Sequence, residues 1–244
     1  MNTQPSRGGK ATSVDVVIPV YNEERALPQS VATLREFLSK NLPQSCKIVI
    51  ADNASTDKTW EVAQDLARRY PDVVAQHIDQ KGRGRALKHS WLQSEADIVS
   101  YMDVDLSTDL TAFPPLIQAI EDGYDIAIGS RFLGGSKVKR SFKRELTSRG
   151  YIVLIKVLFW SKFSDAQCGF KALSRRAVRE LVPLVEDNEW FFDTELLILA
   201  EKKRFRIKEI PVVWVEDPDS RVRILKTVRQ DIGGLLRMRF RFLG

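Results

Sequence analysis

The chain has 244 residues, 43% of them hydrophobic, and a formal net charge of +6. This length and apolar content fit one α/β domain with a sizeable core and a few appended elements. Cys46 and Cys168 lie far apart and neither belongs to a CxxC pair, which disfavours a disulfide framework or a zinc site. Residues 1–13 are polar and lack an apolar h-region, so we expect a disordered leader, no signal peptide and a cytoplasmic location.

The apolar residues predict alternating strands and helices along the first half of the chain. Strands are expected at 14–18, 47–51, 73–74, 97–102 and 125–129. The first intervening helix contains Leu27, Val31, Leu34, Phe37 and Leu38, and the second opens near Asp57. The third covers 86–93, and the fourth starts after Pro114 and Pro115. Such alternation indicates a Rossmann-like α/β fold, with a mostly parallel central sheet and helices on both faces. Ligands of these sheets lie at the carboxyl ends of the strands, so the polar residues after each strand are site candidates.

The positive charge is concentrated in two segments of the second half. Residues 131–149 contain seven basic residues and one acidic residue, and residues 221–244 contain the same numbers. The rest of the chain is therefore net negative. Two basic segments on an acidic body favour contact with an extended anionic surface, either a membrane leaflet or a nucleic acid. Two solvated loops are the plainer alternative.

Two amphipathic segments coincide with this charge. Residues 147–163 are densely apolar but interrupted by Lys156, and the apolar stretch is shorter than the about 20 residues that span a bilayer. Within residues 221–244, one helical face is apolar and the others are basic, with the apolar positions at Leu225, Val228, Ile232, Leu235 and Leu236. We expect at least one interfacial helix, and core packing is the alternative. The expected division is a leader (1–13), a catalytic domain (14–220, including 147–163) and a basic C-terminal segment (221–244).

Two carboxylates, Asp103 and Asp105, directly follow the fourth predicted strand. At a strand end both can serve one hard cation, and a nucleotide diphosphate supplies further oxygen ligands. A D-x-D triplet is a weak motif alone, and its position at the functional edge of the sheet is what strengthens it. The residues after the first two strands, 19–24 and 52–57, have turn and N-cap interpretations. Together, however, they place carboxylates and amides where a nucleoside would lie.

A basic loop with two glycines, Lys81-Gly82-Arg83-Gly84, precedes the third predicted helix. It does not match the dinucleotide fingerprint, because Leu87 stands where a third glycine is needed, and it does not match the Walker A pattern. A cationic loop that opens a helix still suits contact with a nucleotide. A solvated basic turn is the alternative.

In this order the motifs resemble the inverting glycosyltransferase family 2, which has the GT-A fold, from Val14 to about Val215. The likeness rests on PVYNEE at 19–24, ADNASTD at 51–57, KGRGRA at 81–86 and MDVDLS at 102–107. GSR at 129–131, SRG at 148–150, DAQCGFK at 165–171 and WFFDTELL at 190–197 are similar to the polyprenyl-phosphate sugar synthases, and the last two to dolichyl-phosphate glucose synthases.

The resemblance implies a role for each matching residue. A nucleotide-sugar would contact Pro19, Tyr21, Glu23, Asp52, Lys81, Gly82, Arg83, Asp103, Gln167 and Glu195, with Asp52 at the base. Asp103 and Asp105 would hold Mg²⁺ or Mn²⁺, and the catalytic set would be Asp105, Arg131, Arg149 and Asp193. Asp193 and Glu195 also have a helix-capping interpretation. The chain departs from the family at Gln80–Arg83 and at Ser107, where mannose-transferring relatives often carry Gln.

The expected reaction is inverting transfer of a sugar to a polyprenyl phosphate at the cytoplasmic face of a membrane, with UDP-glucose as the expected donor. A lipid phosphate is already anionic and needs little base assistance, and arginines suit its binding. The alternatives are GDP-mannose as donor and a non-lipid glycan as acceptor. Nucleic-acid binding is disfavoured, because the C-terminal basic residues alternate with Met238, Phe240 and Phe242, which we take as exposed. A membrane-anchoring partner or a homo-oligomer stays open.

Overall fold

The computed structural model describes residues 12–216 and 224–241, without the side chains of 142–144 and 224–226. In chain order its elements are β1 (Ser13–Val20), α1 (Leu27–Asn41), β2 (Ser45–Asn53), α2 (Thr59–Arg69), β3 (Val73–Ile78), α3 (Arg83–Gln93), β4 (Ile98–Met102), the 3₁₀ helix η1 (Leu110–Ala112), α4 (Phe113–Glu121), β5 (Ile126–Ser130), β6 (Lys137–Lys139), α5 (Phe142–Phe159), β7 (Phe170–Ser174), α6 (Arg175–Leu181), the 3₁₀ helix η2 (Val182–Leu184), α7 (Phe192–Lys202), β8 (Ile207–Pro211), β9 (Val213–Val215) and α8 (Ile224–Arg241).

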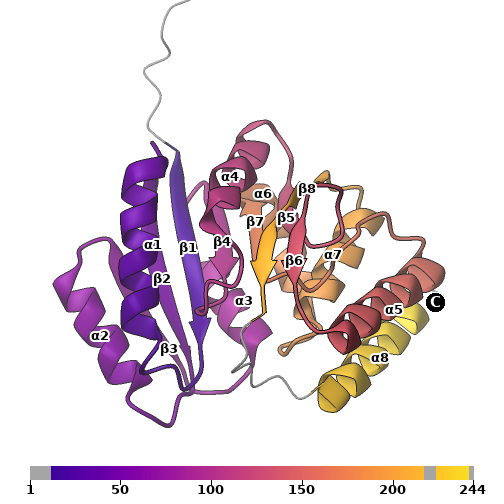
Figure 1. Cartoon of the computed structure of the whole chain (residues 1–244), viewed down its shortest axis with the longest axis horizontal. Helices are drawn as coiled ribbons and strands as arrows, with labels where there is room; N and C mark the ends of the chain where they lie inside the picture. The colour runs from indigo at the N-terminus through magenta and orange to yellow at the C-terminus, as the bar shows by residue number, and fades with distance from the viewer. Residues whose placement is uncertain (1–11, 217–223, 242–244) are drawn as a thin grey trace, which may run out of the picture.

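A seven-stranded sheet with the order β3-β2-β1-β4-β7-β5-β8 forms the centre of the molecule (Figure 1). All neighbouring strands run parallel except β7, which is antiparallel to both β4 and β5. The five strands predicted from the sequence are present as β1 to β5. Strands β7 and β8 were not predicted. Lys171 lies within the five residues of β7, and in β8 exposed positions alternate with half-buried or buried ones, so neither segment is a continuous apolar run.

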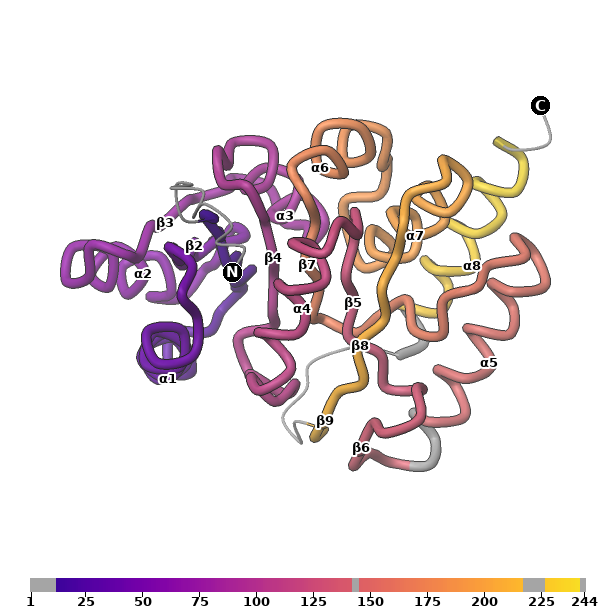
Figure 2. The backbone as a smooth tube through the Cα atoms, turned by 90° about the horizontal axis from the view of Figure 1, so that it is seen from above, coloured from indigo at the N-terminus to yellow at the C-terminus, as the bar shows by residue number. Residues whose placement is uncertain are grey.

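Helices cover both faces of the sheet, as predicted (Figure 2). On one face, α1, α2 and α4 pack over a core that includes Ile18, Leu34 and Phe113. On the other face, α3, α5, α6, α7 and α8 pack over a second core that includes Trp91, Tyr101 and Phe192. The sheet is therefore buried on both sides, which explains the continuous apolar runs of its parallel strands.

The helix boundaries differ from the predicted ones at positions where proline or backbone conformation determines the start or end of a helix. Helix α4 begins at Phe113 and includes both prolines in its first turn, where a missing N–H costs nothing. The apolar helix expected over 147–163 is α5, which begins five residues earlier at Phe142. It ends at Phe159 because Trp160 adopts a left-handed conformation with φ of 60°.

Helices α5 and α8 lie side by side at one end of the molecule, beyond β8 (Figures 1 and 2). In α8, Leu235 and Met238 are buried against the core, whereas Ile232, Leu236 and Phe240 are exposed. The expectation that Met238 is exposed was therefore wrong, because this side of α8 packs on α7. Phe242 and residues 217–223 lie outside the described residues, as do residues 1–11 of the expected leader, while Ser13 is already part of β1.

Within residues 12–216 and 224–241, no helix is both long enough and apolar enough to cross a bilayer.

The order of the strands in the sheet locates the site. Strands β2 and β3 extend to one side of β1 and β4 lies on its other side, so the order of the strands reverses between β1 and β4. Ligands of open α/β sheets bind in the crevice at such a reversal, outside the carboxyl ends of the strands.

Candidate active site

One end of the crevice is formed by the ends of β1, β2 and β3. Asp52 is fully buried, and its Oδ2 accepts a hydrogen bond from Nδ1 of His77 at 2.7 Å. Its Oδ1 is also buried and has no hydrogen-bond partner within the part of the chain that the structure describes. A buried polar atom normally has a partner, so this oxygen is poised to accept a hydrogen bond from a ligand.

A loop between β3 and α3 closes over the same end. The backbone N–H of Gly82 donates to Oδ1 of Asn53 at 2.7 Å, which ties the loop to the end of β2. The Lys81 ammonium lies 3.3 Å from the centroid of the Tyr21 ring, directly after β1. Four predicted donor-site residues, Tyr21, Asp52, Lys81 and Gly82, thus come from elements that meet at one end of the sheet.

The floor of the crevice is a buried ionic cluster centred on Arg83. Its guanidinium donates to Oδ2 of Asp193 at 2.6 Å and to Oδ1 of Asp103 at 2.8 Å. Asp193 Oδ1 also accepts from the Tyr101 hydroxyl at 2.6 Å and pairs with the Lys171 ammonium at 3.1 Å. The cluster joins α3, β4, β7 and α7, and two positive charges balance two negative ones.

This balance fixes the charge of the buried groups. Burial alone would raise the pKa of Asp193, but Lys171 and Arg83 lower it below its usual value. Burial would likewise lower the pKa of Arg83, but the negative charges around it raise that pKa well above its usual value. Both groups therefore stay ionised, and Asp103 is held at the edge of the crevice by a permanent cation.

Asp103 and Asp105 lie at the end of β4, and the protein approaches Asp103 very closely there. A Cβ added to Gly169 would stand 1.7 Å from Oδ2 of Asp103, so a larger residue fits there only if the carboxylate moves. Asp105 is exposed, and its Oδ1 accepts from the backbone N–H of Ser107 at 2.9 Å. Both carboxylates line one small hollow with Thr108 and Gly169.

These two carboxylates fit a hard divalent cation, since oxygen ligands are what Mg²⁺ and Mn²⁺ prefer. The described residues contain no group of three or more His, Cys, Asp and Glu side chains arranged to hold a metal ion. A cation at Asp103 and Asp105 would therefore complete its ligands with the oxygens of a bound diphosphate and with water.

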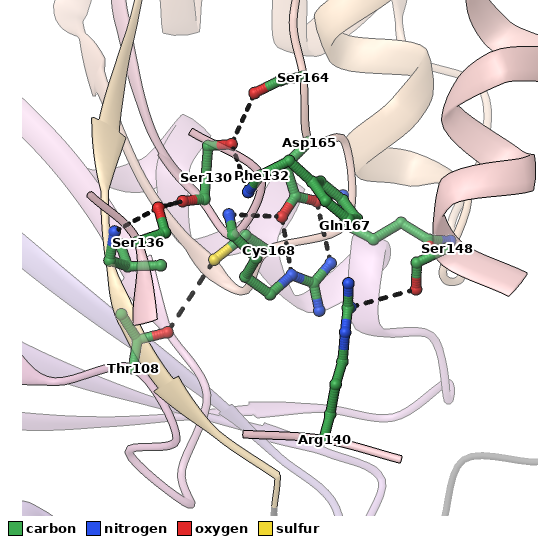
Figure 3. A network of polar contacts seen from close by, with 12 residues as sticks. Thr108, Ser130, Phe132, Ser136, Arg140, Ser148, Ser164, Asp165, Gln167 and Cys168 are labelled. Atoms are coloured by element: carbon green, nitrogen blue, oxygen red, sulfur yellow. Dashed lines mark hydrogen bonds and ion pairs between the residues drawn. The ribbon is translucent and has the colours of Figure 1, made fainter. Parts of the chain in front are cut away.

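A second ionic pair lies beyond β5. Arg131 is buried and donates from Nε and Nη2 to the two oxygens of Asp165, at 2.7 and 2.9 Å. Burial would lower the pKa of Arg131, but Asp165 raises it, so the pair is fully ionised. Figure 3 shows Asp165 beside Gln167, with Arg140 directed toward Ser148. Gln167 donates from Nε2 to Oδ2 of Asp231 on α8 at 2.8 Å, so the segment after α5 is fixed to the last helix.

Two arginines pack on Phe132, and a third, Arg131, is its neighbour in the chain. The guanidinium carbon atoms of Arg140 and Arg149 lie 4.9 and 5.2 Å from the centroid of its ring, and both side chains pair with Glu145. Arg131 precedes Phe132 in the chain, and its positive charge contributes, after burial, to lowering the pKa of Arg140. Arg140 was not predicted. The only signal for it is the density of basic residues in 131–149.

The remaining predicted residues have other surroundings. Glu195 is fully buried, accepts from the backbone N–H groups of Glu186 and Asp187, and pairs with Arg237 of α8 at 2.5 Å. Pro19 lies within β1, and the backbone N–H of Glu23 donates to the Thr59 hydroxyl at 2.7 Å. Donor contacts by these three residues stay predictions.

Sequence analysis also missed His77 and Tyr101, and it named Gly169 and Lys171 only within the DAQCGFK motif, without a role. Each lies inside or beside a strand, where its spacing resembles that of ordinary core or surface residues. Only the pairing of β2 with β3 and of β4 with β7 reveals what His77 and Lys171 contact.

A mostly parallel sheet with acidic residues at the carboxyl ends of the strands next to its switch point is typical of α/β proteins that bind ligands at this edge. The comparison with known families makes this specific. Residues 15–182 match the sequence pattern described as Glycosyl transferase family 2, which is more than half of the chain. The chain belongs to this family, as its motifs predicted.

Among similar proteins is the glycosyltransferase AglD of Haloferax volcanii, 37% identical over 218 residues that cover 88% of this chain and 35% of AglD. The dolichyl-phosphate beta-glucosyltransferase of Dictyostelium discoideum is 30% identical, covering 94% of this chain and 75% of its own length. The dolichol-phosphate mannosyltransferase of Pyrococcus furiosus is 34% identical, covering 82% and 56%. The chain thus spans about a third of AglD and just over half of the mannosyltransferase.

Among solved structures, glucosyl-3-phosphoglycerate synthase from Mycobacterium tuberculosis in complex with uridine diphosphate matches with a TM-score of 0.71. The identity is 20%, and the match covers 94% of this chain and 80% of that one. A complex of the same enzyme with Mn²⁺ and UDP-glucose matches with a TM-score of 0.66 at 18% identity, covering 94% and 79%. These similarities confirm the predicted GT-A fold.

Proposed function

We propose that this chain transfers glucose from UDP-glucose to a polyprenyl phosphate, with inversion at the anomeric carbon. The observation that carries the proposal is the packing of Arg140 and Arg149 on Phe132, beside Arg131 in the chain, together with the exposed apolar residues of α5 and α8. A phosphate on an apolar chain needs both features together. The relatives named dolichyl-phosphate beta-glucosyltransferases support the same donor sugar and acceptor.

The donor half of the site is the crevice between β1 and β4. Asp52 and Tyr21 would bind the base of the nucleotide-sugar. The basic loop with Lys81 and Arg83 would bind its diphosphate. Asp103 and Asp105 would hold a divalent cation, which supplies Lewis-acid stabilisation of the leaving diphosphate when bound. Arg83 holds Asp103 in place, because its guanidinium is itself fixed by Asp193.

The acceptor half is the arginine cluster. Arg131 is fixed by Asp165, whereas the Arg149 side chain is 63% exposed and free to turn toward an incoming phosphate from its place beside Glu145. A phosphate oxygen attacks the anomeric carbon from the face opposite the diphosphate, and the bond to the diphosphate oxygen breaks with its electron pair. The nucleophile is already anionic, so alignment and charge stabilisation do the catalytic work.

The membrane-facing surface is proposed to be the apolar side of α5 and α8. It consists of the exposed residues Leu146, Val153, Leu154, Val157, Trp160, Ile232, Leu236 and Phe240. Trp160 is 86% exposed, and Lys156 and Arg239 lie within the same helices. An apolar surface with an aromatic side chain and cations at its border matches an anionic leaflet, to which each nearby Lys or Arg contributes about 1 kcal/mol. The proposed location is therefore peripheral, on the cytoplasmic face.

The similarity to the dolichol-phosphate mannosyltransferase favours a second candidate, transfer of mannose from GDP-mannose to the same acceptor. It keeps the fold, the metal and the arginine cluster and changes the base and the sugar.

One assay separates these functions. Purified protein is incubated with labelled UDP-glucose, UDP-glucuronate, UDP-N-acetylglucosamine or GDP-mannose, each with and without polyprenyl phosphate and Mn²⁺. Thin-layer chromatography should show one lipid-linked product, from UDP-glucose, that needs both additions, and NMR should show a β linkage. A lipid-linked product that forms from GDP-mannose and from no other donor supports the second candidate. Transfer without lipid phosphate contradicts both.

A further inference from the structure

We propose that His77 selects the nucleobase: by occupying one oxygen of Asp52, it favours uracil over guanine. The inference rests on the proposed donor site and extends it to a residue outside the motifs of the sequence. It concerns specificity, and assigns His77 no part in the chemical step.

The two residues are direct neighbours across the sheet. Asp52 on β2 and His77 on β3 are paired in the strand register, so the contact is built into the fold and does not depend on a loop. Nδ1 of His77 donates to Oδ2 of Asp52 at 2.7 Å. The ring is held in turn, with Nε2 at 3.4 Å from Oδ1 of Asp79 and the Trp60 ring centroid at 5.1 Å.

This arrangement leaves the carboxylate with one oxygen for a ligand. Asp52 is 0% exposed, and Oδ1 is the one of its two oxygens that accepts nothing from the residues described. The Tyr21 ring lies under the Lys81 ammonium, and Tyr21 directly follows Val20, which pairs with Asp52 in the strand register. A planar group with one N–H donor would stack on Tyr21 in the place of Lys81 and donate to Oδ1.

The two bases differ in how many donors they offer. Uracil has a single N–H, between two carbonyl oxygens, and therefore needs one carboxylate oxygen. Guanine presents an adjacent N–H and NH₂ pair, which binds best when both oxygens of a carboxylate accept in parallel. With Oδ2 already accepting from His77, guanine would have to share this oxygen with Nδ1, whereas uracil would need only Oδ1. Sites built to match hydrogen bonds reject the mismatched ligand because unpaired buried groups are costly.

The test is a comparison of two dissociation constants. Binding of UDP and of GDP, each with Mn²⁺, is measured by calorimetry for the wild type, His77→Ala, His77→Asn and His89→Ala. The diphosphate and metal contacts are common to both ligands and cancel in the ratio. Asn keeps an N–H donor near the place of Nδ1, and His89 is the only other histidine, which makes it a matched control.

The wild type should bind UDP at least tenfold more tightly than GDP. His77→Ala should reduce this ratio about tenfold, while His77→Asn and His89→Ala keep it within about threefold of the wild type. An unchanged ratio in His77→Ala, including an equal loss for both ligands, overturns the inference, as does a wild type without preference. Binding needs neither sugar nor lipid, so a wild type that transfers glucose but binds UDP and GDP equally refutes the inference alone. Failure of the wild type to bind either nucleotide refutes the donor site as well.

Discussion

Arg83 and Asp103 are joined by a 2.8 Å hydrogen bond between a guanidinium N–H and a carboxylate oxygen, although they belong to different strand–helix units. The same guanidinium binds Asp193, so one cation connects the basic loop, the end of β4 and the start of α7. The residue proposed to hold the metal is thus positioned by the residue proposed to contact the diphosphate. A substitution of either residue therefore affects the position of the other.

Replacing Arg83 with Ala should therefore damage both stability and activity. The change leaves buried Asp193 with one fewer cation, a loss that costs about 3 kcal/mol, or about 6–12 °C in melting temperature for a domain of this size. Arg68→Ala, which removes a surface pair on α2, should change the melting temperature by less than about 2 °C. Thermal unfolding checks this, and equal small shifts would contradict the role of Arg83.

Asp105→Ala should separate metal binding from folding. Asp105 is exposed at the end of β4, so the melting temperature without metal should stay close to that of the wild type. Turnover should fall about 100-fold or more, since stabilisation of the leaving diphosphate is lost. Rates are measured across a Mn²⁺ titration, and normal turnover at saturating Mn²⁺ would refute the metal role.

Gly169→Ala should impair the same site through sterics alone. The new Cβ meets the Asp103 carboxylate at 1.7 Å, so the carboxylate must move away from its present place. Affinity for UDP with Mn²⁺, measured by calorimetry, should fall by about tenfold or more, as when the groups that orient a metal ligand are changed. Gly134→Ala, where a Cβ meets nothing within 4 Å, is the matched control. Equal affinities for the two variants would mean that the position of Asp103 does not matter.

Asp231 should make the docking of α8 sensitive to pH. Burial raises the pKa of Asp231 from 3.8 to about 7. A folded-state pKa above the unfolded value means that the folded state binds the proton more tightly. The resulting stability is complete below about pH 4 and is lost as pH rises through about 7. Asp231→Asn should remove this component and raise the melting temperature at pH 8 by about 3–6 °C, roughly 1–2 kcal/mol.

Melting curves from pH 5 to pH 8 check this, with the exposed Asp65→Asn as control. The gap between Asp231→Asn and the wild type should widen with pH. A gap that is constant across the range would show that Asp231 does not titrate there.

Arg149→Ala should weaken the acceptor more than the donor. One charge-assisted contact to phosphate is worth about 1.5–3 kcal/mol, so the KM for polyprenyl phosphate should rise about tenfold or more. The KM for UDP-glucose should change less than about twofold. Arg68→Ala on the distant α2 carries the same charge change and should alter neither. Equal effects of Arg149→Ala on both substrates would argue against an acceptor site there.

The sequence predicted those parts of the site that follow directly from strand ends. Asp103 and Asp105 could be located because an apolar strand delivers them to the edge where ligands bind. The partner of Asp103 could not be located from the sequence. Its contact with Arg83 depends on α7, which brings Asp193 next to the same guanidinium. Met238 was misplaced for a similar reason, since the apolar stripe of α8 does not tell which part packs on α7. Tertiary contacts decide these cases.

The claim that glucose goes to a lipid phosphate is tested most directly by a matched pair of acceptors. Vesicles with polyprenyl phosphate, or with the same polyprenol lacking its phosphate, are incubated with the protein, labelled UDP-glucose and Mn²⁺, and the label in the lipid phase is counted. The account predicts label only with the phosphate, and its loss when UDP-glucose is replaced by GDP-mannose. Equal label with the free alcohol, or none with the phosphate, would contradict it.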